Sequence, residues 1–476
     1  MVVEGWLERA AAAAPELLAV ETPEGSLSYA QLLARARAGA GELAQCGVGP
    51  GARVAIALPP GLAFAQSLHA CLLAGAVAVP VDLRLSAAER EHVAAGAALV
   101  IEEPLGEGSA VDGSPASAHD LTRVAVVIHT SGTTAAPRPV ELTYGNFLWS
   151  ALGSAVALGL DPRERWLCAL PLSHVGGLSI LVRSAIYATT AVIHERFETE
   201  RVLAALREQG ITLVSLVATT LARLLDAGLE GGAGGRRPAG RNGDSRRRRV
   251  SPGFGRAPRN SQSRRPTALR CALTGGGPVP PALLARAAAA GVPVSQTYGL
   301  TESCSQVTTT PLAAIGDAQT GWAGTPLFCT RLSVGADAEI MVAGPTVAPG
   351  SLDEDGWLHT GDLGRLDENG RLRVTGRASD TIVSGGENIA PTEVEAVLEA
   401  HPDVLEAAVV SRLDPQWGEA VTAIVVGREG VELAEETLRA HCAASLAPYK
   451  VPKQIVLAIE PLPRTRSGKL LRRELV

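Results

Sequence analysis

The feature that most restricts the fold of this chain is an alternation of helical stretches with short apolar strands over residues 1–230. Alanine-rich helices are predicted over residues 29–43, 61–74 and 199–209. The predicted strands are 54–58, 77–81, 124–129, 166–170, 191–194 and 213–217. Because strands that are apolar throughout must be covered on both faces, the alternation predicts an α/β fold of stacked, mainly parallel sheets covered by helices.

A change of composition near residues 376–379 predicts a linker into a second unit. The chain has 476 residues, which exceeds a typical single domain. The elements predicted in the second unit are helices at 391–400 and 434–446 and strands at 405–410 and 420–426. We therefore predict a large N-terminal domain, residues 1–378, and a small, mobile α+β lid domain, residues 379–476.

Residues 231–266 interrupt the alternation with eleven arginines and a single acid, Asp244. An arginine cluster of this kind is typical of segments that bind nucleic acid. No aromatic platform or basic helix accompanies it, however, and aliphatic residues are almost absent. Such a segment buries too little apolar area to offset its ordering entropy. We predict a disordered loop here and no nucleic-acid partner.

Cysteine usage and apolar runs indicate the compartment. The seven cysteines form no Cys-x-x-Cys pair, which is typical of buried thiols in a reducing environment. The N-terminus has no basic region before an apolar core, so no signal peptide is predicted. The most apolar run, residues 62–83, contains polar residues and Pro80 and is too interrupted to span a bilayer. We expect a cytoplasmic protein without membrane insertion.

A hydroxyl-rich loop, residues 129–140, follows one predicted strand with the sequence HTSGTTAAPRPV. Hydroxyls and backbone N–H groups around a glycine can bind phosphate oxygens, and an arginine can balance their charge. The loop is not the P-loop of NTPases, which needs Gly-x-x-x-x-Gly-Lys. The candidate phosphate-binding residues are Thr130, Ser131, Gly132, Thr133, Thr134 and Arg138.

A second motif, QTYGLTESCSQ at residues 296–306, combines an aromatic ring with a hydroxyl and a carboxylate. Tyr298 offers a flat face for a purine. Thr301 and Glu302 place a hydroxyl beside a carboxylate, which suits a phosphate and its Mg²⁺. Without other evidence, a surface turn with an isolated glutamate is an equally good interpretation.

Further along, the segment 356–395 holds an isolated acid, Asp362, and an arginine, Arg377. Lys469 follows near the C-terminus in a Ser-Gly-Lys turn. An acid able to hold a ribose, a mobile segment and a distant lysine together indicate a nucleotide enzyme with a lid.

In their order and spacing, these motifs resemble those of the adenylate-forming enzyme superfamily, which includes acyl-CoA synthetases, luciferases and peptide-synthetase adenylation domains. The resemblance covers nearly the whole chain except residues 231–266. Its five segments are 129–140, 296–306, 360–362, 376–377 and 467–469.

The resemblance implies binding sites for ATP, Mg²⁺ and coenzyme A. Residues 130–134 would form a mobile phosphate loop, and Tyr298 would lie against the adenine, with Gly275, Gly276 and Gly277 along the adenosine. Thr301 would contact the α-phosphate and Glu302 would bind Mg²⁺. The implied roles nearer the lid are ribose binding by Asp362 with Arg377 beside it, a hinge at Ser379, a slot for pantetheine at Ser384, Gly385 and Gly386, and catalysis by Lys469.

Four segments, 170–179, 296–306, 384–389 and 448–453, are similar to those of the o-succinylbenzoate–CoA ligases of menaquinone biosynthesis. That similarity implies a pocket for an aromatic ring with two carboxyl groups, acting with ATP and CoA. His174 would line or gate this pocket. The residues expected to hydrogen-bond the acid are Ser303, Ser305 and Gln306. Arg183 is either a partner for the non-reacting carboxylate or a member of a structural ion pair.

Two other functions stay open. One is a CoA ligase for another aryl acid or a fatty acid. The other is an inactive nucleotide-binding relative, which is suggested by the arginine-rich segment 231–266 and by Ala135 and Pro139, which stand where the superfamily usually has glycine. Arg138 also departs from the superfamily pattern, in which lysine is usual. The proline at position 139 removes an N–H group and stiffens the loop. Dimers are common among the relatives, so a homodimer is the oligomeric state that the resemblance implies.

Overall fold

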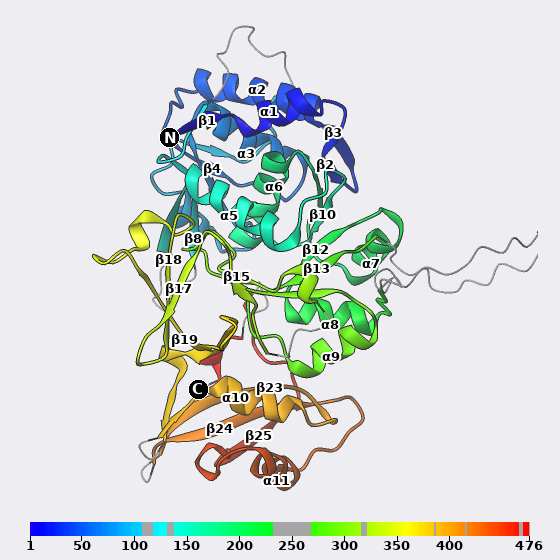
Figure 1. Ribbon diagram of the computed structural model, residues 1–476, viewed down its shortest axis with the longest axis vertical. Coiled ribbons are helices and arrows are strands. Elements are labelled where there is room, and N and C mark those ends of the chain that lie inside the picture. The colour runs from blue at the N-terminus through cyan, green and yellow to red at the C-terminus, as the bar shows by residue number, and fades with distance from the viewer. Residues whose placement is uncertain are drawn as a thin grey trace, which may run out of the picture.

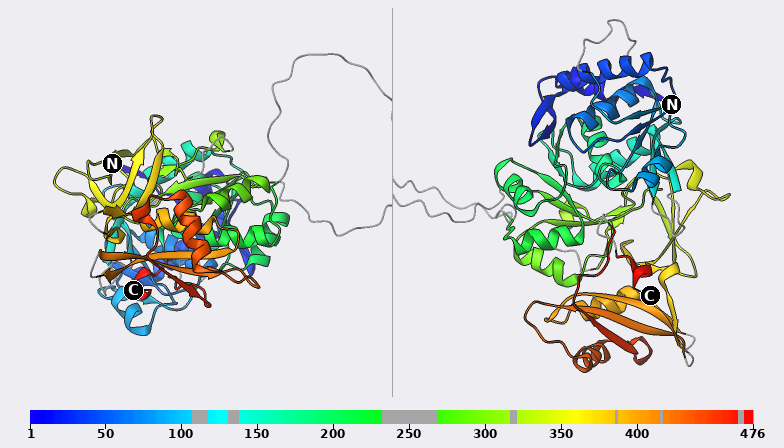
Figure 2. Two further views of the ribbon diagram at one scale, coloured as in Figure 1. Left: turned by 90° about the horizontal axis from the view of Figure 1, so that it is seen from below. Right: turned by 180° about the vertical axis from the view of Figure 1, so that it is seen from behind.

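The computed structural model describes residues 1–106, 118–130, 138–231, 268–315, 321–384, 387–414, 417–465 and 470–475. It has a large body and a smaller body, and the C-terminal residues lie between the two (Figures 1 and 2). The predicted disordered loop, 231–266, lies outside the described residues except for Gly231.

The large body is built on a nine-stranded sheet with the order β16-β15-β14-β13-β12-β10-β11-β2-β3. The strands from β14 to β2 pair in parallel, and the strands at both ends pair antiparallel. In the sheet order, the bounds are Thr325–Pro326, Thr308–Thr309, Val294–Tyr298, Cys271–Thr274, Leu213–Leu216, Arg165–Cys168, Thr190–Ile193, Leu18–Thr22 and Gly25–Ser28.

A second sheet of five strands has the order β6-β4-β5-β8-β9, in which only β8 and β9 pair antiparallel. Their bounds are Leu99–Ile101, Arg53–Ile56, Val77–Pro80, Val124–Thr130 and Arg138–Thr143. All four residues of β5 are buried, as expected for a strand covered on both faces.

Helices cover both faces of the nine-stranded sheet. Successive side chains of a strand point to opposite faces, so Trp166 and Cys168 of β10 join one core cluster while Leu167 joins another. The first cluster also contains side chains from α1 (Trp6–Ala13), α2 (Tyr29–Gln45), α3 (Leu62–Ala74), α5 (Tyr144–Leu158) and α6 (Val175–Tyr187). The second contains side chains from α7 (Thr199–Glu208), α8 (Ala218–Asp226) and α9 (Pro281–Ala289).

An antiparallel four-stranded sheet, β17-β18-β19-β20, lies beside these layers and reaches toward the smaller body (Figure 1). Its bounds are Arg331–Val334, Glu339–Ala343, Leu358–Leu366 and Leu372–Arg377. The remaining elements of the large body are α4 (Ala87–Ala94) and the pair β1 (Val2–Glu4) and β7 (Ala118–Asp120).

The smaller body is a sheet of five strands, β22-β21-β24-β23 with β25 beside β24, packed with two helices. The strand bounds are Glu387–Ile389, Ile382–Ser384, Gly418–Gly427, Val404–Asp414 and Gln454–Ala458. The helices are α10 (Pro391–Glu399) and α11 (Glu435–Ser445).

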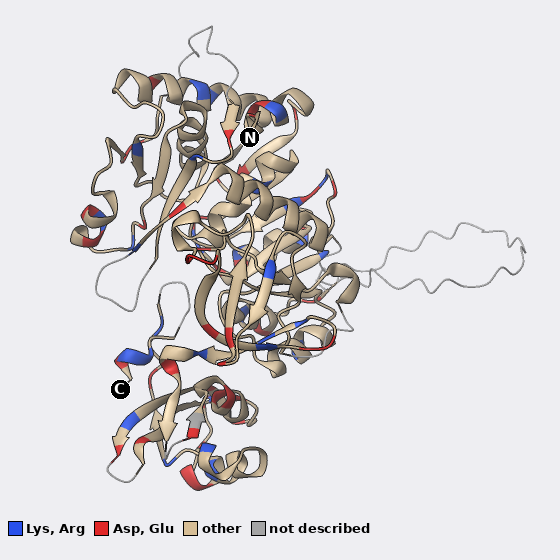
Figure 3. Ribbon diagram, turned by 60° about the vertical axis from the view of Figure 1, so that its left-hand side comes forward, with Lys and Arg blue, Asp and Glu red and all other residues tan. Residues whose placement is uncertain are grey.

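The predicted fold class, an α/β body with a small α+β unit, is confirmed. Each helix and strand predicted from the sequence is present, with ends shifted by a few residues. The antiparallel sheet β17–β20 was not predicted. No helix of the described residues has the length and apolarity needed to cross a membrane. Lys and Arg residues are interspersed with Asp and Glu residues over both bodies (Figure 3).

Candidate functional site

Several of the predicted site residues follow parallel strands of the nine-stranded sheet. His174 comes after β10, Gly275 follows β13 directly, and Tyr298 ends β14. These strands run parallel through β12, so their carboxyl ends lie along one edge of the sheet. Ligands of open α/β sheets bind at this edge.

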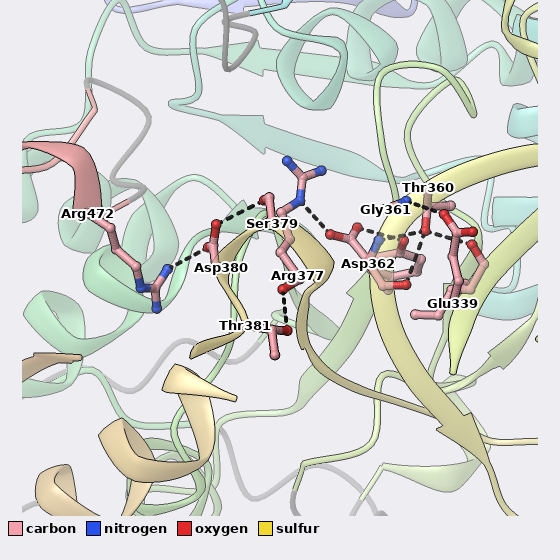
Figure 4. Close-up of polar contacts among 11 residues, drawn as sticks. Glu339, Thr360, Gly361, Asp362, Arg377, Ser379, Asp380, Thr381 and Arg472 are labelled. Atoms are coloured by element: carbon pink, nitrogen blue, oxygen red, sulfur yellow. Dashed lines mark hydrogen bonds and ion pairs between the residues drawn. The ribbon is translucent and has the colours of Figure 1, made fainter. Parts of the chain in front are cut away.

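Asp362 is the centre of the best-defined polar cluster at this edge. Its side chain is 11% exposed, and each carboxylate oxygen accepts one hydrogen bond. Tyr298 Oη donates to Oδ2 at 2.8 Å, and Arg377 Nε donates to Oδ1 at 2.6 Å. Asp362 and Arg377 face each other across β19 and β20, so the strand register itself brings the ion pair together (Figure 4).

The backbone around Asp362 is fixed by Thr360, which belongs to one of the five sequence motifs but had no role assigned to it from the sequence. Thr360 Oγ1 accepts from the Asp362 N–H at 3.0 Å and donates to the carbonyl oxygen of Ile340 at 2.7 Å. Gly361 N donates to Glu339 Oε1 at 2.9 Å (Figure 4). The Thr-Gly-Asp sequence was a signal for Thr360, but its partners lie on β18 and cannot be read from it.

This cluster can accept hydrogen bonds from a ligand. A carboxylate oxygen has two lone pairs, so each oxygen of Asp362 can accept a further bond. Burial and the negative charge of Asp362 raise the pKa of Tyr298, which therefore stays protonated and remains a donor. Two adjacent acceptors on one rigid carboxylate match a pair of vicinal hydroxyl groups, such as those of a ribose.

The turn after Tyr298 carries Thr301 and Glu302. Ala348 N donates to the carbonyl oxygen of Glu302 at 2.7 Å. The Thr301 hydroxyl and the Glu302 carboxylate have no hydrogen bond or ion pair to any described residue, so both are available to a ligand. Mg²⁺ is commonly bound by one or two carboxylates together with substrate phosphates, and this pair of donors fits such an ion.

The turn is unusually tight. A side chain at Gly299 would place its Cβ 1.5 Å from the carbonyl oxygen of Ser305. Cys304 and Ser305 have φ values of 52° and 94°, in the left-handed region that disfavours residues with side chains. Only glycine therefore fits at position 299.

Three glycines, Gly275 to Gly277, follow β13, and the last of them has open space around it. A Cβ at Gly275 would come within 2.7 Å of the carbonyl oxygen of Thr297, so this backbone lies directly against β14. Gly276 has a φ of 78°, and nothing lies within 4 Å of a Cβ built on Gly277. A flat ligand can therefore approach the backbone here.

The predicted phosphate loop falls in the sequence between β8 and β9. Thr130 and Arg138 pair across this hairpin, and Thr130 Oγ1 donates to the carbonyl oxygen of Arg138 at 3.4 Å. The other predicted phosphate-binding residues, 131–134, lie outside the described residues.

The predicted acyl-pocket residues differ in their surroundings. His174 precedes α6, and its charge interactions are with Asp82 and Arg84, which follow β5 of the other sheet. Burial lowers the pKa of His174, which favours its neutral form. Ser305 is partly exposed.

Ser303 and Gln306 are buried and already bonded within the protein. Ser303 Oγ accepts from the N–H of Leu300 and donates to its carbonyl oxygen, both at 3.1 Å. Gln306 Nε2 donates to Thr309 Oγ1 at 2.9 Å, whereas its Oε1 is buried with no partner in the described structure. The structural ion pair considered for Arg183 was wrong, because no carboxylate of the described residues lies within ion-pair distance of it.

At the predicted hinge, Ser379 lies in a short 3₁₀ turn, Ala378–Asp380, directly after β20. Ser379 Oγ donates to Asp380 Oδ1 at 3.0 Å, and Arg472 Nη1 donates to Asp380 Oδ2 at 3.3 Å (Figure 4). Arg472 also donates two bonds to the buried carboxylate of Glu395 at 2.7 and 2.8 Å.

The sequence did not identify Arg472 as a structural residue, although it follows the predicted catalytic lysine by three positions. That lysine, Lys469, lies outside the described residues, as do Gly385 and Gly386. Ser384 is described and buried.

Comparison with known proteins agrees with this geometry. The model of the AMP-binding enzyme family matches residues 7–111 and 97–352, and that of the AMP-binding enzyme C-terminal domain matches residues 393–469. The 2-succinylbenzoate–CoA ligase of Bacillus licheniformis is 37% identical over 99% of this chain and 98% of its own length. The ligase of the same name from Bacillus cereus strain AH820 is 36% identical over 99% and 97%.

The chain is also similar to solved structures of a synthetase that acts on o-succinylbenzoate. The o-succinylbenzoate coenzyme A synthetase of Bacillus subtilis in complex with ATP and magnesium ion has a TM-score of 0.85 and 34% identity and is matched over 100% of both chains. The same synthetase in complex with the acyl-adenylate intermediate OSB-AMP has a TM-score of 0.84 and 33% identity over 100% of this chain and 98% of the other. This chain belongs to the AMP-binding enzyme family.

Proposed function

We propose that the protein is an ATP-dependent acyl-CoA ligase that converts 2-succinylbenzoate to 2-succinylbenzoyl-CoA for menaquinone biosynthesis. The observation that carries the proposal is the Asp362 cluster with Tyr298 and Arg377, in a chain similar over its whole length to ligases of this name. We place this activity in the cytoplasm, where ATP and CoA are available. The resemblance also implies a homodimer, and light scattering from the purified protein would measure its oligomeric state.

In the first step, an oxygen of the substrate carboxylate attacks the α-phosphorus of ATP. The bond to the β-phosphate oxygen breaks, pyrophosphate leaves, and an acyl-adenylate forms. Asp362 would hold the ribose, Tyr298 would lie against the adenine, and Thr301 would contact the α-phosphate. When bound by Glu302, Mg²⁺ supplies positive charge that offsets the charge of the phosphates.

Negative charge gathers on the phosphate oxygens during this step, so a cation close to the α-phosphate lowers the barrier. Lys469 is the residue that we assign to this role. Arg138 and the hydroxyls of Thr130, Ser131, Thr133 and Thr134 would hold the β- and γ-phosphates as pyrophosphate leaves, with the N–H of Gly132.

In the second step, the CoA thiol loses its proton and attacks the acyl carbon. The bond between that carbon and the phosphate oxygen breaks, AMP leaves with the electron pair, and the thioester forms. We propose that the lid, residues 379–476, turns about Ser379 between the steps. This turn would withdraw Lys469 and bring the Ser384–Gly386 segment to the pantetheine.

The acyl specificity is tested by pyrophosphate release. The purified protein is incubated with ATP, Mg²⁺ and CoA and one acid at a time: 2-succinylbenzoate, benzoate or octanoate. Release stimulated by 2-succinylbenzoate alone is the expected result. Stimulation by octanoate or benzoate instead would replace the proposal with a ligase for another acid. ATP binding in titration calorimetry, without adenylate formed from any acid, would indicate an inactive relative.

The two half-reactions test the lid. We expect Lys469→Ala to abolish adenylate formation nearly completely while thioester formation from supplied acyl-adenylate continues. Arg473→Ala, which removes an exposed charge from the same segment, is the matched control and should leave both half-reactions unchanged. Equal loss of both half-reactions in the lysine variant would contradict the lid mechanism.

A further inference from the structure

Asp362 lies in a bulge of β19, where the ladder with β18 is interrupted. The strand register shifts between Glu339 and Met341 of β18. Ile340, which lies between them, stands opposite residues 360–362 of β19, so three residues face one. A bulge of this kind leaves backbone groups without partners in the neighbouring strand and changes the direction of a side chain. The backbone of residues 360–362 therefore needs other hydrogen-bond partners to keep its shape.

Side chains take the place of the missing ladder partners. The N–H of Gly361 donates to Glu339 Oε1 at 2.9 Å, and the N–H of Asp362 donates to Thr360 Oγ1 at 3.0 Å (Figure 4). Gly361 has a φ of 68°, in the left-handed region that glycine adopts readily. Glu339 thus supports, from β18, the backbone that leads into the Asp362 carboxylate.

The second oxygen of Glu339 contacts His359, the residue directly before the bulge. His359 Nδ1 lies 2.7 Å from Glu339 Oε2, and His359 Nε2 lies 3.1 Å from Asp353 Oδ2. An ionised carboxylate only accepts hydrogen bonds, and a neutral imidazole has a single N–H. Both contacts can therefore be hydrogen bonds only when each ring nitrogen carries a proton. The hydrogen bond to Glu339, with the charges of both carboxylates, raises the pKa of His359 and favours this imidazolium form.

Asp353 anchors the other side of the imidazole ring. Its Oδ1 accepts from the N–H of Trp357 at 2.7 Å and from that of Asp355 at 3.0 Å. The bond from Trp357 holds the pKa of Asp353 below its usual range, so this carboxylate is ionised at neutral pH. The charged groups that act on His359 come from two elements, Glu339 from β18 and Asp353 from the turn before β19. The imidazolium therefore joins this turn to β18 beside the bulge.

We propose that the His359 imidazolium is a positioning residue, which acts through Glu339 to keep the Asp362 carboxylate directed at the ribose of ATP. The inference rests on the proposed function of Asp362 in ribose binding. The imidazolium loses a proton as the pH rises through its pKa, and one of its two hydrogen bonds is then lost. ATP binding should therefore be supported by His359 at low pH and less so at high pH.

The test compares His359→Gln, His359→Lys and Glu339→Gln with the wild-type protein. Glutamine at 359 removes the charge, whereas lysine keeps a positive charge at pH 9. Glu339→Gln keeps an oxygen for the N–H of Gly361, but its amide nitrogen cannot accept a bond from the imidazolium. Arg365→Gln is the matched control, because it removes an exposed charge from the same strand, β19.

Affinity for ATP in the presence of Mg²⁺ is measured by calorimetry at pH 6.5 and pH 9. The KM for the acid is measured by pyrophosphate release, and thermal melting is recorded for every variant. The side chains of His359 and Glu339 are 51% and 20% exposed, so solvent weakens their interaction. At pH 6.5 we expect His359→Gln and Glu339→Gln each to weaken ATP binding about fivefold, the upper range for a partly exposed ion pair.

At pH 9 the difference between the wild-type protein and His359→Gln should shrink to about twofold, because the wild-type ring has lost its charge and one donor. His359→Lys should bind ATP within about twofold of the wild-type protein at pH 6.5 and should keep that affinity at pH 9. In the double variant with glutamine at both positions, the loss should stay within about twofold of Glu339→Gln alone, because both changes break one link. The KM for the acid should not change.

Four results would overturn the inference. They are a ratio of wild-type to His359→Gln affinity that is the same at both pH values, an additive loss in the double variant, an equal loss in Arg365→Gln, and a lower melting temperature with unchanged ATP affinity. If His359→Gln does not fold, the affinity of Glu339→Gln at pH 6.5 decides. A wild-type protein that binds no ATP at either pH would overturn the proposed function as well, which distinguishes the two failures.

Discussion

Replacing Arg472 by methionine should destabilise the smaller body in a way that depends on pH. Arg472 makes two hydrogen bonds to Glu395, and the side chains of the two residues are 22% and 11% exposed. Removing one partner of a buried ion pair costs about 3–5 kcal/mol, and the partial exposure of Arg472 favours the lower value, about 3 kcal/mol. Among the described residues, Glu395 would then keep one hydrogen-bond donor, the N–H of Val409, which donates to its Oε1 at 2.8 Å.

The sign of the pH dependence follows from Glu395. Burial raises its pKa even with Arg472 in place. Without the arginine, the pKa in the folded protein rises further, while that in the unfolded chain stays near 4.3. The folded state then holds a proton that the unfolded state releases, so the free energy of unfolding increases as the pH falls. The loss should be largest at pH 8 and smaller at pH 5.5.

The assay is urea unfolding followed by the fluorescence of Trp417, the one tryptophan in residues 379–476. Because the five other tryptophans contribute to the signal, both proteins carry Phe at those positions. Arg439→Met is the control, since Arg439 lies in the same body and pairs with Glu435 at 3.8 Å with 41% of its side chain exposed. A loss no larger than that of the control, or one that does not change between pH 8 and 5.5, would refute the reasoning.

Three further predictions concern other regions. Burial lowers the pKa of His69 to about 4, so His69 is protonated in the unfolded chain at a higher pH than in the folded protein. The free energy of unfolding should therefore drop by about 2 kcal/mol between pH 7.5 and 5. Urea unfolding of His69→Gln should lack this part of the slope, whereas the exposed control His92→Gln should keep it. Gly299→Ala should lower the free energy of unfolding in the same assay by more than about 3 kcal/mol, because its Cβ would overlap the Ser305 carbonyl; a stable variant would show that the turn can move. Asp362→Asn should raise the KM for ATP about tenfold in the pyrophosphate assay. An unchanged KM would show that Asp362 does not bind the ribose.

The sequence predicted the layers of the fold because buried parallel strands leave a strong local signal. The run Val77–Pro80 is apolar on both faces and forms a central strand, as expected. The sheet β17–β20 was missed because polar residues interrupt the apolar residues within its strands. β17 has no buried residue, and the middle of β20 is only partly buried. Their pairing depends on partners that are distant in the chain.

The candidate site was predictable as a set of motifs but not as a set of contacts. Tyr298, Asp362 and Arg377 were each identified, and the structure brings their side chains together. That the tyrosine hydroxyl would bond the aspartate could not be read from the sequence, because 64 positions separate them. Glu339 and Gly361 lie on two neighbouring strands, and only the shift in the strand register reveals the hydrogen bond between them.

The position of Arg377 has a thermodynamic consequence. It bonds to Asp362 through its side chain, and its backbone leads directly into the Ala378–Asp380 turn. A ligand on Asp362 and the orientation of residues 379–476 therefore act on the same residue. If a nucleotide favours one orientation by a given factor, that orientation must tighten nucleotide binding by the same factor, because such coupling is reciprocal. If residues 379–476 turn as proposed, Arg377 would then set how strongly nucleotide exchange and that turn influence each other.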